Sequence, residues 1–218
     1  RKLLFLSYED FDELRVKKVP WFSLFLLVLC SAWVILSIGV NGWAFESFSV
    51  NPMFGPSAET LLKMGALYAP KIIEDDEWWR VLSATVLHAG IFHWLMNALM
   101  VVFLGIPLER VHGTAVTALT FVGGGVAANL VSADFSPLTV GMGTSGGVCA
   151  WMGFCLVDGI THWNLLKLLN DRTELSIRFI LVYALFEIVF MIALGYLPWI
   201  DNFVHLGGLF YGICLGLI

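Results

Sequence analysis

Long runs without a charged residue constrain this chain more than any other feature. A membrane-spanning helix needs roughly 20 mostly apolar residues, and backbone in lipid must satisfy its hydrogen bonds within the segment. Each run is therefore predicted to be helical. The predicted helices cover residues 21–41, 92–108, 114–132, 145–159, 178–197 and 202–218. The expected fold class is all-α, a polytopic membrane protein with a bundle of six transmembrane helices.

Composition agrees with this reading and excludes several functions. Only 13% of the 218 residues are charged, against about 25% in soluble domains. The net charge of −5 with scattered cations argues against nucleic-acid binding. The four cysteines lie inside apolar runs without the spacing of a zinc site, so they are predicted to be small buried apolar residues. Because the chain begins at Arg1 and ends within an apolar run at Ile218, we expect it to be a piece of a longer protein, in which a seventh helix can follow.

The placement of lysine and arginine predicts the orientation. Residues 1–20 and the loops after the second and fourth predicted helices hold most of the cations, and the opposite side holds Lys63, Lys71 and Arg80. Positive charge is retained on the cytoplasmic side. We therefore expect residues 1–20 to be a cytoplasmic segment and residues 21–218 to be the membrane domain, with a long lumenal loop at about 42–91. Aromatic residues in this loop favour the membrane interface, and the turn-forming residues 51–57 exclude a long helix there.

Four polar residues stand out because polar side chains are costly inside a membrane. His93 and Asn97 share one face of the second predicted helix. Ser145 begins the fourth predicted helix within a glycine-rich stretch, and His205 lies near the start of the sixth. All three helices run inward from the lumenal side, so the four residues share a depth. A 15-residue fourth helix rises about 22 Å, less than the roughly 30 Å hydrocarbon core, so Ser145 is expected below the outer surface.

Serine and histidine at one depth indicate nucleophilic catalysis. Serine becomes a nucleophile when a neighbouring imidazole takes its proton. Free N–H groups at the start of the fourth helix, with His93 and Asn97, are able to bind an oxyanion; Gly143 allows a close backbone approach. Taken singly, each residue has a simpler explanation, because glycine and serine line packed membrane helices and a histidine often bonds between helices. Catalysis is favoured because the residues have the types that the reaction needs and lie on the same side of the membrane at the same depth.

The motifs resemble those of the rhomboid family of intramembrane serine proteases. They are His88-x4-His93-x3-Asn97, Gly143-x-Ser145-Gly146 and His205-x2-Gly208-x3-Gly212, with Trp79-Arg80 and Glu109-Arg110-x2-Gly113 in the loops. The 51–57 segment looks like the secretase-type eukaryotic branch. The resemblance implies a six-helix bundle that cleaves single-span transmembrane proteins within or near the bilayer. It also implies Ser145 as nucleophile, His205 as base, and His93, Asn97 and Gly143 at the oxyanion and substrate-binding site.

Two residues and two other functions remain open at this stage. Cys149 lies where many relatives have a tyrosine stacked on the catalytic histidine, and Glu187 lies in the middle of the fifth predicted helix. A catalytically inactive rhomboid-like escort that binds membrane segments is the main alternative. A small transporter or channel is the other, but its expected inverted repeats are not found. The natural substrate, the organelle and the oligomeric state do not follow from the sequence.

Overall fold

The computed structural model describes residues 19–161, residue 189 and residues 201–218. The cytoplasmic segment predicted for residues 1–20 therefore lies almost wholly outside the described residues. The fifth predicted helix, 178–197, lies outside them as well apart from residue 189, and so does Glu187.

The described residues form helices joined by loops, which confirms the all-α prediction. An isolated antiparallel bridge between Leu67 and Gly141 is the only β-type pairing in this part of the chain. A π-helical turn, Val101–Gly105, joins two of the helices into one continuous segment. The helices are α2 Trp21–Val40, α3 Ala58–Lys63, α4 Ala69–Glu74, α5 Arg80–Ser83, α6 Ile91–Met100, α7 Ile106–His112, α8 Thr114–Phe135, α9 Ser145–Thr161 and α12 Asn202–Gly216.

Three helical segments are long and apolar enough to cross a membrane: Trp21–Val40, Ile91–His112 and Thr114–Phe135. They coincide with the first three predicted helices, whereas α9 and α12 are apolar but shorter. The second span runs four residues beyond its predicted end at Leu108, because Glu109 is buried rather than solvated. Its carboxylate accepts the backbone N–H groups of Phe22 and Ser23 at 2.9 and 2.8 Å. Glu109 thus caps the start of α2, and the charge does not end the helix.

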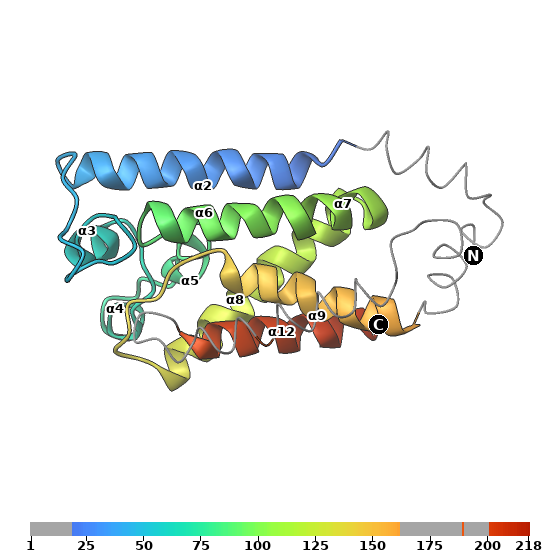
Figure 1. Ribbon diagram of the computed structural model, residues 1–218. Coiled ribbons are helices and arrows are strands. Elements are labelled where there is room, and N and C mark those ends of the chain that lie inside the picture. Colours follow the sequence, from blue (N-terminus) through green and yellow to red (C-terminus); the bar gives the residue numbers. More distant parts are fainter. Residues whose placement is uncertain (1–18, 162–188, 190–200) are drawn as a thin grey trace.

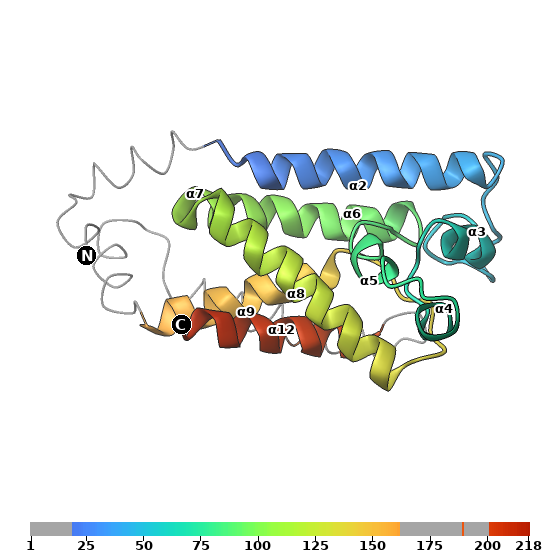
Figure 2. The ribbon, with the colours of Figure 1, turned by 180° about the vertical axis from the view of Figure 1, so that it is seen from behind.

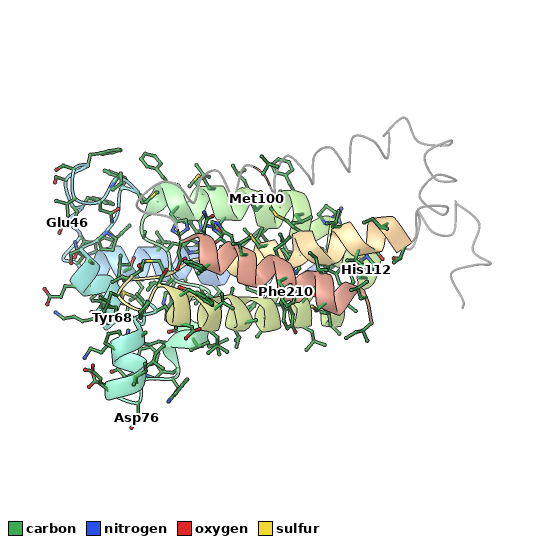
Figure 3. All side chains as sticks on the ribbon, turned by 90° about the horizontal axis from the view of Figure 1, so that it is seen from below. Glu46, Tyr68, Asp76, Met100, His112 and Phe210 are labelled. Atoms are coloured by element: carbon green, nitrogen blue, oxygen red, sulfur yellow. The ribbon has the colours of Figure 1, made fainter. Side chains whose placement is uncertain are left out.

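The helices are arranged so that α6, α9 and α12 begin at the same end of the molecule. Figure 1 shows this end beside the short helices α3, α4 and α5, with α2 running alongside α6. From behind, α8 crosses the bundle obliquely in front of α9 and α12 (Figure 2). The labelled loop residues Glu46, Tyr68 and Asp76 lie at this same end, and His112 lies toward the other (Figure 3). The shared starting end is the arrangement that the sequence predicted for the three polar helices.

Helices α9 and α12 pack with their backbones in direct contact. A Cβ added to Gly208 would lie 2.1 Å from the carbonyl oxygen of Gly146, and one added to Gly212 would lie 1.9 Å from that of Ala150. A Cβ on Gly153 of α9 would lie 2.3 Å from the carbonyl oxygen of Leu209. Small residues permit this approach between membrane helices.

The loop between α2 and α6 is organised around Arg80, which is 4% exposed. Its guanidinium donates to the carbonyl oxygens of Leu62 and Ala66 at 2.7 and 2.9 Å, and its Nε donates to the Glu77 carboxylate at 2.6 Å. These bonds connect the first residue of α5 to α3, to the segment between α3 and α4, and to the segment between α4 and α5. Short helices and turns thus replace a long helix here, as the turn residues indicated.

Candidate active site

Ser145 is the first residue of α9 and is largely buried, at 7% exposed. It follows Gly143, whose φ of 127° lies in the region that favours glycine. A Cβ added to Gly143 would lie 2.9 Å from Nε2 of His93 and 3.8 Å from Oγ of Ser145. Gly143 thus lets the loop pass between the two side chains. The predicted residues His93, Gly143 and Ser145 converge at one point.

His205 lies in the first turn of α12, directly after Val204, and both residues are buried. Cγ1 of Val204 would lie 3.1 Å from a Cβ added to Gly146, the residue after Ser145. The contact brings the two chain segments that carry Ser145 and His205 side by side. His205 is also close enough to His93 for the two imidazoles to interact electrostatically. The structure therefore gathers α6, α9 and α12 around a single polar site.

His93 and Asn97 lie one turn apart on α6, as the spacing predicted. The side-chain amide of Asn97 donates to the His93 carbonyl oxygen at 2.9 Å; an amide has two N–H donors, so one remains for another acceptor. The backbone N–H of Ala89 donates to Nδ1 of His93 at 3.4 Å. Because Nδ1 accepts, the proton of the neutral ring lies on Nε2, the nitrogen beside Gly143. Both residues can present a donor toward an oxyanion.

His88 is buried behind this site, at 1% exposed. Its Nδ1 is 3.1 Å from the Val86 carbonyl oxygen, which can only accept, so Nε2 accepts from the Thr144 hydroxyl at 3.5 Å. Burial, followed by the nearby His93, lowers the pKa of His88 to about 3. A small pocket is lined by His88, Asn97 and Thr144 together with Trp94 and apolar residues of α2. His88 therefore packs the loop onto Thr144 and also borders this pocket.

Several polar residues that support the site were missed in the sequence. Asp201 caps α12 by accepting the N–H of Phe203 at 2.8 Å, and its other carboxylate oxygen accepts a short hydrogen bond from Ser132 of α8. Asn51 bonds to the carbonyl oxygen of Ala89 at 2.8 Å. An aspartate immediately before an apolar helix is a capping signal that was available in the sequence. The long-range partners of Asn51 and Ser132 carry no such signal.

Cys149 is buried in the main apolar cluster together with Leu26, Cys30 and Trp151. Its side chain thus fills core space one turn after Ser145. The effect of this cysteine on the positioning of His205 stays a prediction. Among residues 19–161 and 201–218, no group of three His, Cys, Asp or Glu side chains is placed to hold a metal ion.

Comparison with known proteins gives consistent matches. The model of the rhomboid domain matches residues 75–218. The chain is 38% identical to RHOMBOID-like protein 6, mitochondrial, of Arabidopsis thaliana over 176 residues, which are 81% of this chain and 55% of the relative. It is 36% identical to RHOMBOID-like protein 2 of the same plant, over 81% of this chain and 53% of the relative.

One further relative is named as inactive. Inactive RHOMBOID-like protein 8 of Arabidopsis thaliana is 28% identical over 93% of this chain and 60% of its own length. The chain spans about half the length of the relatives named first. The family-model match includes α6, α9 and α12, which carry four of the predicted site residues, and the loop before α9, which carries Gly143. This chain is thus an integral, multi-pass membrane protein that belongs to the rhomboid family.

Proposed function

We propose that this protein is an intramembrane serine endopeptidase that cleaves single-span transmembrane proteins within or near the bilayer. The observation that carries the proposal is the close approach of Val204 to Gly146, because these residues are the chain neighbours of His205 and Ser145. The convergence of His93 and Gly143 on Ser145 adds oxyanion donors to the same point. Membership of a family of intramembrane serine proteases supports the reaction class.

In the proposed reaction, Oγ of Ser145 attacks the scissile carbonyl carbon while His205 takes the hydroxyl proton. The negative charge that forms on the carbonyl oxygen is stabilised by Nε2–H of His93, the free amide N–H of Asn97 and the N–H of Ser145. The N–H of Ser145 belongs to the first position of a helix, which has no intrahelical acceptor. One such donor lowers the barrier by roughly 3 kcal/mol.

The tetrahedral intermediate collapses by breaking the C–N bond, and His205 delivers its proton to the departing amine. The acyl group stays on Ser145 as an ester. Water then attacks the ester with His205 again as base, releasing the carboxylate product and the free serine. These steps need no metal ion or organic cofactor.

The orientation is part of the proposal. The starts of α6, α9 and α12 lie at one end (Figure 1), so the polar site opens toward that end. The distribution of cations in the sequence makes it the lumenal or extracellular end, with a cytoplasmic N-terminus. The peptide bond is then cut on the outer side of the bilayer.

Cleavage of a single-span model substrate in proteoliposomes tests the proposal. We expect a defined product with the wild-type protein and none with Ser145→Ala or His205→Ala. A folded wild-type protein that cuts nothing across a panel of substrates would favour the alternative, an inactive escort, for which the relative named as inactive is the precedent.

A further inference from the structure

The start of α6 is covered by a turn that lies nearly 40 residues earlier in the chain, residues 51–56. The backbone N–H groups of Ile91 and Phe92 donate to the carbonyl oxygens of Phe54 and Met53 at 3.0 and 3.1 Å. First-turn N–H groups have no partner within their own helix, and Gly90 at the N-cap offers no side-chain oxygen. The 51–56 turn therefore caps the helix that carries His93 and Asn97.

The turn is in close backbone contact with residues 89 and 90. A Cβ added to Gly55 would lie 2.0 Å from the carbonyl oxygen of Ala89, and one added to Gly90 would lie 2.3 Å from that of Met53. Phe54, at a φ of 55°, makes the reversal that turns its carbonyl toward α6. This fit leaves little freedom for Ala89.

Asn51 holds the two segments together. Its Nδ2 donates to the carbonyl oxygens of Pro56 and Ala89 at 2.9 and 2.8 Å, and its Oδ1 accepts the N–H of Met53 at 3.0 Å. One side chain thus closes the turn on itself and binds it to Ala89. No other residue type offers an acceptor and two donors in the same planar shape at this length.

Ala89 is the residue whose N–H reaches Nδ1 of His93. We propose that Asn51 is a positioning residue for His93: by fixing Ala89 it keeps Nδ1 an acceptor and Nε2 a donor directed at Gly143 and Ser145. The inference rests on the proposed function, because the donor at Nε2 matters if an oxyanion forms beside Ser145. The loop between α2 and α6 then takes part in setting the tautomer of an active-site histidine.

The tautomer is measured directly by ¹⁵N NMR of protein labelled at histidine, in the Ser145→Ala background at pH 8. The chain has five histidines, and the signals of His93 are identified by their loss in His93→Ala. We expect His93 to carry its proton on Nε2. A proton on Nδ1 would overturn the inference, and this reading needs neither catalysis nor an Asn51 variant that folds.

The second measurement uses the isosteric variant Asn51→Asp, which keeps the acceptor for Met53 and loses both donors. Asn41→Asp is the matched control: Asn41 is also half-buried in the same loop, and its Nδ2 donates to the carbonyl oxygen of Ala44 at 2.8 Å, not to that of Ala89. A misdirected oxyanion donor costs less than the 10²–10³ of a missing one. We expect Asn51→Asp to lower kcat roughly tenfold with KM within about twofold, and the control to change neither.

Binding of a peptide aldehyde separates positioning from general damage to the fold. The aldehyde forms a tetrahedral adduct with Ser145, so its affinity should fall by the same factor as kcat in Asn51→Asp. Equal losses in Asn51→Asp and Asn41→Asp, or a kcat unchanged in Asn51→Asp, would overturn the inference. If the wild-type protein cuts nothing while His93 carries its proton on Nε2, the proposed function fails and the positional role of Asn51 stands.

Discussion

The site is built from two regions that hold their residues by different means. Ser145 and His205 lie on α9 and α12, whose backbones are in contact at their junction, with Gly208 against Gly146 and Gly212 against Ala150. At the start of α6, His93 is held by hydrogen bonds that pass from Asn51 through Ala89. Packing tolerates almost no added volume, whereas a hydrogen-bonded turn tolerates volume but depends on donors and acceptors. The two regions should therefore fail under different substitutions.

The largest effect is expected where packing is closest. Gly208→Ala would place a methyl group 2.1 Å from the carbonyl oxygen of Gly146, so α12 must move away from α9. Overpacking of this kind costs about 1–3 kcal/mol or more. Since His205, the proposed base, moves with α12, we expect cleavage to fall roughly 100-fold and the unfolding temperature to fall with it.

Gly39→Ala is the control for this prediction. A Cβ at Gly39 meets its nearest neighbour, the ring of Trp43, at an ordinary 3.5 Å. Alanine is favoured over glycine inside a helix, so this variant should be as stable as the wild-type protein and fully active. Unimpaired cleavage by Gly208→Ala would show that the junction does not set the geometry of Ser145 and His205.

Glu109 tests how much hydrogen bonds contribute to stability at a position outside the candidate site. Besides Phe22 and Ser23 it accepts from the hydroxyl of Thr114 at 2.7 Å, so Glu109→Ala leaves several buried donors without an acceptor. Each unsatisfied group costs about 1–3 kcal/mol. We expect a clear loss of stability in detergent unfolding, with kcat of the folded protein nearly unchanged. Glu59→Ala, which breaks an exposed pair with Lys63, should have no measurable effect; a comparable loss there would contradict the prediction.

The site residues were predictable because polar side chains are rare in these helices. His93, Asn97, Ser145 and His205 stood out against apolar surroundings, and the shared starting end of their helices followed from counting spans. The end of the second span was misplaced at Leu108 because the uncharged run ends there, at the charged residue Glu109. Its burial depends on the start of α2, more than 80 residues away, which no local pattern reports.

The supporting residues were not predictable for the same reason. Asn51 and Ala89 are 38 positions apart, and Ser132 and Asp201 are 69 apart. An asparagine beside a proline is a common turn signal, and a serine in an apolar helix is a common packing residue. Each becomes informative once its partner is known, and partners are set by the tertiary fold.

A smaller effect is expected for Arg80, in the loop between α2 and α6. Arg80→Lys keeps the charge but loses the planar fork that reaches Leu62, Ala66 and Glu77 together. We expect a loss of about 1–2 kcal/mol in stability and faster cleavage of the loop by an added protease. Arg110→Lys, at an exposed position, should leave both readouts unchanged. Equal behaviour of the two variants would mean that the fork does not hold the loop together.

The smallest effect is expected where the two means of support meet, at Ser132. Its hydroxyl bonds to Asp201 at the start of α12, so Ser132→Ala removes a tether on the helix that carries His205. The hydroxyl of Thr120, also buried on α8, bonds within its own helix, to the carbonyl oxygen of Val116 at 2.8 Å, which makes Thr120→Val a matched removal. We expect Ser132→Ala to lose about 1 kcal/mol of stability and a few-fold in kcat, with KM unchanged and with Thr120→Val near wild type.

Asp201→Asn completes this test, because asparagine caps a helix about as well as aspartate, and its Nδ2 can donate to the Ser132 hydroxyl, which can also accept. It should therefore stay close to wild type, whereas Asp201→Ala should resemble or exceed Ser132→Ala. If Ser132→Ala and Thr120→Val prove indistinguishable in kcat, the glycine contacts alone hold α12 in place. The junction would then be positioned by packing without help from hydrogen bonds, and the contrast with the Asn51 region would be complete.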